Sequence, residues 1–174
     1  DQQRGWLHEQ HLAIAASHQR IRSAAATVLS LLHGAGIETR VLKGLATAEL
    51  DYPNRQLRHT GDVDLAVRPV DLERAGELLR ANGHRVQPQY QGQPGSRPSP
   101  SQHPALLRGW TLDARNGVEI DLHNRLFLRS PFDDELFADA GEQLASLPGR
   151  GLRAEHRLVH AAGHFMISQP GTRR

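Results

Sequence analysis

The chain has 174 residues, with 21 Lys and Arg against 19 Asp and Glu, and it contains no cysteine. This length is enough for one domain with a hydrophobic core, and the lack of cysteine excludes a disulfide framework, a thiolate metal site and a cysteine nucleophile. No apolar stretch approaches the roughly 20 residues of a membrane helix and the acidic start does not resemble a signal peptide, so we expect a cytoplasmic protein with no membrane partner.

The first part of the sequence predicts a helix, a strand and a second helix. Apolar residues that include Leu12 and Ile14 recur at helical spacing over residues 7–33, and glycines follow this segment. A short run of β-forming residues predicts a strand over 39–42. After a glycine turn, residues 45–50 are expected to form a helix.

An acidic strand, a helix and a long loop are predicted next. Acidic and apolar residues alternate over 62–67, as in a strand with one buried face. Asp71 is placed to cap a helix that ends at Asn82 and Gly83. Residues 87–104 carry five prolines among Gln, Ser and Gly without apolar periodicity, which predicts a mobile loop.

The rest of the chain predicts a hairpin and two helices. Strands over 106–113 and 118–122 flank an Asn-Gly pair, which is a strong signal for a tight turn. Helices are expected over 131–140 and 152–167. The alternation of helices with short strands predicts an α/β (α+β) fold with a small mixed β-sheet flanked by helices.

We expect three parts in this fold. Residues 1–36 form an N-terminal helical segment, residues 37–150 form the core with its mobile loop, and residues 151–174 form a C-terminal helix. The last residues carry no helix-capping signal, which favours a truncated chain.

Two carboxylates, Asp62 and Asp64, are the first chemical feature. They lie two residues apart in the predicted strand, so both project from one face. Adjacent carboxylates raise the free energy of ionising each other unless a cation lies between them, and Mg²⁺, which prefers oxygen ligands, fits that position. Asp121 in the hairpin would complete such a site, because it too is flanked by apolar residues. Acids that merely solvate an edge strand explain the pair equally well.

The second chemical feature is Lys43-Gly44, between the predicted strand and helix. Glycine allows close approach of the backbone, and the first N–H groups of a helix point toward an anion. Lys43 is also the only lysine in the chain, since arginine fills every other cationic position. This turn is therefore expected to hold phosphate.

Three motifs in this order resemble a known family. Leu42-Lys43-Gly44, residues 58–67 and residues 119–123 are similar to the uncharacterised nucleotidyltransferase family of the polymerase-β-like nucleotidyltransferase superfamily. The resemblance spans roughly half of the chain. It implies a minimal nucleotidyltransferase core that moves a nucleoside monophosphate from an NTP such as ATP to a hydroxyl acceptor and releases pyrophosphate. It also implies Mg²⁺ ions, or Mn²⁺ in their place, held by the three aspartates.

The same resemblance extends the nucleotide site to Thr47 and Gly61. Many superfamily members have a Gly-Gly or Gly-Ser pair where this chain has Gly44-Leu45. Thr47 is therefore the candidate for a hydroxyl contact to phosphate, and Gly61 lies in the loop before the acid pair. Asp121 is expected to take the proton of the acceptor hydroxyl.

Arg58 and His123 complete the set of candidate site residues. Arg58 matches an arginine of the family motif, and it either clamps phosphate or forms an ion pair with Asp62. His123 shares a strand face with Asp121. It therefore either contacts a metal-binding carboxylate or the acceptor, or lies in solvent at the strand end.

The remaining histidines and tryptophans are expected to have structural roles. His156, His160 and His164 would line one helix face, a spacing that alone is weak evidence for zinc. Trp6 and Trp110 are expected to pack in the core rather than stack on bases.

Neither the acceptor nor the oligomeric state is predicted. The acceptor would be a peptide, a small metabolite or tRNA, the last as in a toxin-type tRNA-modifying transferase. The competing hypothesis is a non-catalytic RNA- or DNA-binding module, which would depend on arginines and salt but tolerate loss of the three acids.

Overall fold

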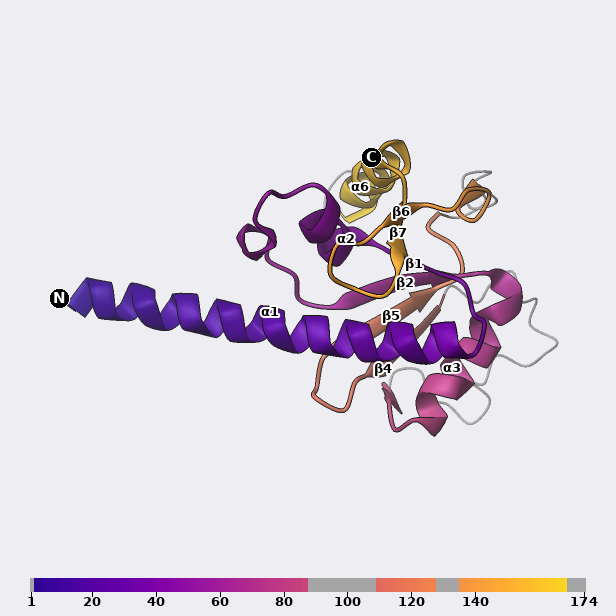
Figure 1. The fold of residues 1–174 in the computed structure, drawn as a ribbon, viewed down its shortest axis with the longest axis horizontal. Helices are drawn as coiled ribbons and strands as arrows, with labels where there is room; N and C mark the ends of the chain where they lie inside the picture. The colour runs from indigo at the N-terminus through magenta and orange to yellow at the C-terminus, as the bar shows by residue number, and fades with distance from the viewer. Residues whose placement is uncertain (1, 88–108, 128–134, 169–174) are drawn as a thin grey trace, which may run out of the picture.

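A seven-stranded mixed sheet forms the centre of the fold within residues 2–87, 109–127 and 135–168, the part of the chain that the computed structural model describes. The strands are β1 (Thr39–Val41), β2 (Val63–Val67), β3 (Arg85–Val86), β4 (Gly109–Asp113), β5 (Glu119–His123), β6 (Glu142–Gln143) and β7 (Arg150–Gly151), in the spatial order β3-β4-β5-β2-β1-β7-β6. The helices are α1 (Gln2–Gly34), α2 (Lys43–Leu50), α3 (Leu72–Ala81) and α6 (Ala154–Ser168), with short 3-10 helices at Arg55–Leu57 and Pro69–Asp71. The α/β class and the mixed sheet expected from the sequence are confirmed (Figure 1).

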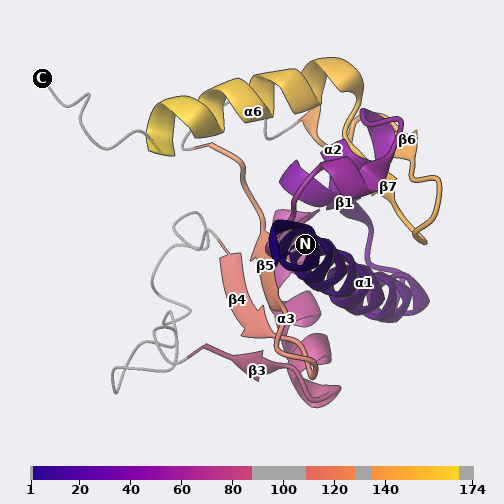
Figure 2. The same cartoon turned by 90° about the vertical axis from the view of Figure 1, so that its left-hand side faces the viewer.

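The central strand of this sheet is β2. It pairs with β1 antiparallel and with β5 in parallel, and all five of its residues are buried, as in strands covered on both faces. Val63 and Leu65 pack in the main core with α1 and α3, whereas Ala66 packs on the other face with Leu42 and Leu152. Figure 2 shows α6 apart from α1 and α3. The explanation of the acid pair as groups that solvate an edge strand is therefore wrong.

The first helix is longer than the predicted 7–33 and projects beyond the sheet (Figure 1). In its C-terminal half, Ile21 and Val28 are buried in the main core. In its N-terminal half, Trp6, Leu12 and Ile14 are 60%, 53% and 43% exposed, so their expected burial is wrong. Helical spacing identifies apolar residues that share a face of the helix, but the N-terminal half of α1 extends past the elements against which that face could pack. No helix in the described ranges is long and apolar enough to cross a membrane.

The predicted hairpin is confirmed. The N–H of Ala114 donates to the carbonyl of Val118 at 2.8 Å, and Gly117, with φ +78°, supplies the left-handed residue that such a turn requires. Trp110 on β4 packs against the main core as expected. The predicted residues 106–108 of this strand lie outside the described residues.

Other elements differ from the prediction because they are short. The sequence does not predict β3, β6 and β7, which have two residues each, too few for a detectable alternation. Gln87, the first residue of the expected loop, follows β3 directly and its N–H donates to the carbonyl of Thr111 at 3.1 Å; residues 88–104 of that loop lie outside the described ranges. The helix expected over 131–140 is a turn from residue 136 onward, and residues 131–134 are not described.

Candidate active site

Two acidic strands lie side by side in the middle of the sheet. In the parallel β2–β5 pair, Asp64 is directly opposite Asp121, so both carboxylates are on one face. Asp62 immediately precedes β2 and is partly exposed. Its carboxylate and those of Glu119 and Asp121 each offer an oxygen within 4.8 Å of the others, and donor atoms of Asp64, Asp121 and His123 are equally close. The structure thus brings together the three aspartates that the sequence singles out.

Asp64 is an ionised carboxylate in a buried position. Its side chain is 2% exposed, and Nζ of Lys43 donates to its Oδ1 at 2.5 Å. Nε2 of His123 lies 2.9 Å from the same oxygen. Burial raises the pKa of a carboxyl group, but the hydrogen bond from His123 and the charge and hydrogen bond of Lys43 outweigh it and hold the pKa of Asp64 below its ordinary value.

The pKa of Asp62 shifts in the opposite direction. Burial raises it and the charge of Asp64 raises it further, whereas Lys43 offsets part of this rise. Asp121 and Glu119 add to the increase. The carboxylates therefore carry more negative charge than Lys43 compensates, which favours a divalent cation with oxygen ligands at this position.

The start of α2 lies beside these acids. The helix begins at Lys43 rather than at residue 45, so Lys43 and Gly44 form its first turn. Lys43 has φ +47°, an uncommon conformation for a residue with a Cβ, which fits a functional position. A Cβ on Gly44 would lie 2.9 Å from Cγ2 of Thr60, so any larger residue there would have to displace the Thr60 side chain or the loop before β2.

A pocket of about 510 Å³ opens over these groups. The first turn of α2, the loop before β2 and α6 form its walls, so the unpaired N–H groups that a helix start carries lie close to it. The expected site residues that line it are Lys43, Gly44, Thr47, Arg58, Gly61, Asp62 and Asp64. Of the described residues expected in the site, Asp121 and His123 do not line the pocket but adjoin Asp64.

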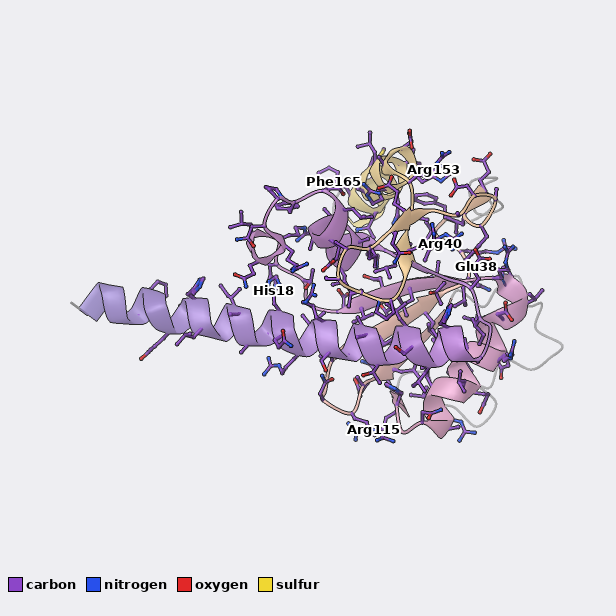
Figure 3. All side chains as sticks on the ribbon, in the orientation of Figure 1. His18, Glu38, Arg40, Arg115, Arg153 and Phe165 are labelled. Atoms are coloured by element: carbon purple, nitrogen blue, oxygen red, sulfur yellow. The ribbon has the colours of Figure 1, made fainter. Side chains whose placement is uncertain are left out.

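The loop before β2 contains an internal hydrogen bond and contacts α1. Nη1 of Arg58 donates to the carbonyl of His59 at 2.6 Å, and the described contacts of Arg58 do not include the ion pair with Asp62 that was one of its expected roles. The ring of His18 on α1 lies edge-on to the ring of His59, with 6.3 Å between centroids, so α1 contacts this loop (Figure 3 labels His18). The loop is thus supported by a helix far from it in sequence.

A comparison with known families agrees with this geometry. A family model described as Uncharacterised nucleotidyltransferase matches residues 2–170. The chain belongs to this nucleotidyltransferase family. No curated protein matches the chain. The match includes α1 and α6, which lie outside the segment that carries the sequence motifs.

Helix α6 supplies a pocket wall that the sequence does not identify. His160, His164 and Phe165 line the pocket, and Figure 3 shows Phe165 on this helix. His160 is 6% exposed, and its ring lies 6.0 Å from that of Phe127 and 6.4 Å from that of His164. Burial, together with the charge of Lys43, lowers the pKa of His160 to about 4. His160 thus lies on a helix face, as expected, and this face is buried against Phe127 beside the pocket.

Glu119 is a further acid of the candidate site, and the sequence analysis does not identify it. Nε2 of Gln87 donates to its Oε2 at 2.6 Å, and Oγ1 of Thr111 donates to Oδ1 of Asp121 at the same distance. Both carboxylates are therefore oriented by side chains on or next to the neighbouring strands. The signal was present in the sequence, because Glu119, Asp121 and His123 alternate with apolar residues and must share one strand face.

Proposed function

We propose that this chain transfers a nucleoside monophosphate from an NTP to a hydroxyl acceptor and releases pyrophosphate, in a reaction that depends on a divalent metal. One observation carries the proposal. Asp64 and Asp121 lie opposite each other in a parallel strand pair, beside a pocket whose wall is the first turn of α2. Fold alone does not determine function, but this set of groups matches what nucleotidyl transfer requires.

The donor set fits a hard divalent cation. Four carboxylates lie close together, and burial and the acidic neighbours raise the pKa of Asp62. Lys43, which donates to Asp64, places one positive charge among them. Asp62, Asp64 and Asp121 would hold the ions, Mg²⁺ or Mn²⁺. When bound, such ions neutralise charge on the attacking and leaving oxygens.

The other residues position the nucleotide and move the proton. Gly44 and Thr47 at the start of α2 are placed to bind phosphate oxygens, and Arg58 and Gly61 of the loop before β2 line the same pocket. The acceptor oxygen attacks the α-phosphorus, the bond to the bridging oxygen breaks, and pyrophosphate leaves. The proton of the acceptor hydroxyl goes to a carboxylate of the cluster, for which we propose Asp121.

The test is incubation of the protein with each NTP and Mg²⁺ or Mn²⁺, in the presence of a peptide, metabolite or tRNA mixture. Pyrophosphate release and a nucleotidyl mass increase on an acceptor would support the proposal. The matched variants are Asp64→Asn, which should be inactive, and Asp71→Asn, whose carboxylate lies outside the pocket and forms a surface ion pair with Arg74. A folded protein that binds no NTP at millimolar Mg²⁺, or equal activity of both variants, would overturn it. RNA or DNA binding that tolerates Asp64→Asn would instead favour a non-catalytic module.

A further inference from the structure

One face of β5 presents three side chains that can bind a metal. Glu119, Asp121 and His123 are partly exposed, and the intervening Ile120 and Leu122 are buried. Alternation along a strand therefore places two carboxylates and an imidazole in a row, next to the acids of β2.

These side chains form two groups that share Asp121. One group consists of Asp62, Glu119 and Asp121 and offers only oxygen, whereas the other consists of Asp64, Asp121 and His123 and includes a nitrogen. In each group, one donor atom per residue lies within 4.8 Å of the others. Donor atoms about 2.1 Å from one ion lie about 3 Å apart when adjacent and about 4 Å apart when opposite, so a small inward movement of the side chains brings each group within reach of a single ion.

The imidazole of His123 is directed at a ligand oxygen. Its Nε2 lies 2.9 Å from Oδ1 of Asp64, and the His123 side chain is 25% exposed while that of Asp64 is 2% exposed. Nζ of Lys43 contacts the same oxygen at 2.5 Å. This oxygen thus already binds a cationic group, and an ion that replaces the ammonium would be bound by Nε2 of His123 in the tautomer that carries its proton on Nδ1.

We propose that Asp64, Asp121 and His123 bind a divalent first-row transition ion in preference to Mg²⁺. Mg²⁺ takes oxygen ligands, whereas imidazole nitrogen is a ligand for transition ions. The all-oxygen group around Asp62 suits Mg²⁺, so the two positions differ in the ion they select. This inference rests on the proposed function, because the same carboxylates hold the ions of the transfer reaction.

Metal binding without nucleotide tests the proposal. Mn²⁺ is the probe, because its free ion is counted directly by electron paramagnetic resonance, and Mg²⁺ affinity follows from calorimetry or from competition with Mn²⁺. His123→Gln retains a hydrogen-bond donor for Asp64 but lacks the imidazole, and His123→Asp supplies an oxygen in its place. His33→Gln is the matched control, because His33 is exposed at the end of α1 and does not line the pocket.

The expected result is a change in metal preference and not merely in affinity. Wild type and His33→Gln should prefer Mn²⁺, and His123→Gln should raise the Kd for Mn²⁺ about 10–100-fold with little change in the Kd for Mg²⁺. This range is the loss of metal affinity that follows mutation of residues hydrogen-bonded to metal ligands, and removal of a ligand itself should cost at least as much. His123→Asp should shift the preference toward Mg²⁺. A histidine that only orients Asp64 would change both affinities alike, and that result, or an unchanged preference in His123→Gln, would overturn the proposal.

A second measurement needs no variant. Pulsed electron paramagnetic resonance of Mn²⁺ bound to the wild type should show coupling to an imidazole nitrogen, and its absence would also overturn the proposal. The two proposals fail separately. Turnover with Mg²⁺ and no role for His123 in metal preference would leave the transfer reaction standing, whereas the expected preference without NTP turnover would leave the metal site standing.

Discussion

Replacing Lys43 with methionine tests how the protein compensates a buried carboxylate. The change keeps a flexible chain but removes the ammonium group that donates to Asp64; the Lys43 side chain is 26% exposed and that of Asp64 is 2% exposed. A hydrogen bond to a charged group contributes about 1.5–3 kcal/mol, and the partial exposure of Lys43 places this one near the lower end, at about 2 kcal/mol. For 174 residues this corresponds to a Tm lower by roughly 4–8 °C.

The loss should depend on pH. Because the pKa of Asp64 is lowered in the folded protein, its ionised form contributes stability above the unfolded pKa of about 4, and this contribution is lost as the pH falls through the folded pKa. Wild type and Lys43→Met should therefore differ most near pH 7 and converge in acid. Urea unfolding followed by circular dichroism, with chelator present, measures both. Lys43→Arg, which keeps the charge, is the control, and equal unfolding free energies of Lys43→Met and wild type at pH 7 would refute the reasoning.

Asp64→Asn and Asp121→Asn should each lower pyrophosphate release by about a hundredfold or more, measured in a coupled assay, because each removes a charge from the site that stabilises the reacting phosphate through its ions. Gly44→Ala should lower the unfolding free energy by about 1–3 kcal/mol and raise the KM for NTP, because the new Cβ would lie 2.9 Å from Cγ2 of Thr60. Denaturant titration measures the first effect and steady-state kinetics the second, and wild-type values in both would contradict this reasoning. Burial lowers the pKa of His160 from 6.5 to about 4, so the unfolded chain binds a proton first and stability falls as the pH drops through that range, by up to about 3 kcal/mol. His160→Gln should remove this pH dependence, as measured by unfolding at several pH values; an unchanged profile would show that His160 is not its source.

The acid strand and the hairpin could be predicted because their signals are local. Alternation over 62–67 and the Asn-Gly turn each depend on a few neighbouring residues, and both are present in the structure. The sequence also indicates that Asp62 and Asp64 share a face. It could not show that β2 is the central strand, since pairing with β1 and β5 depends on segments far away in the chain.

The α6 wall and the projecting part of α1 could not be predicted for a related reason. Helical spacing identifies residues that share a face, but it does not identify what that face contacts. His160 is buried over the pocket, whereas Leu12 and Ile14, which fit the same kind of pattern, are exposed. The difference lies in where the rest of the molecule ends, which is a property of the tertiary fold.

The register between β2 and β5 links strand pairing to metal binding. Asp64 and Asp121 face each other only in the native register, because a slip of one residue would turn Asp121 to the opposite face and bring Ile120 or Leu122 beside Asp64. An ion that both acids hold binds the native pairing and not the slipped one. At a hundred times its Kd, such an ion stabilises the native pairing by about 2.7 kcal/mol. The ion would then favour the native register of β2 and β5 whether or not any reaction takes place.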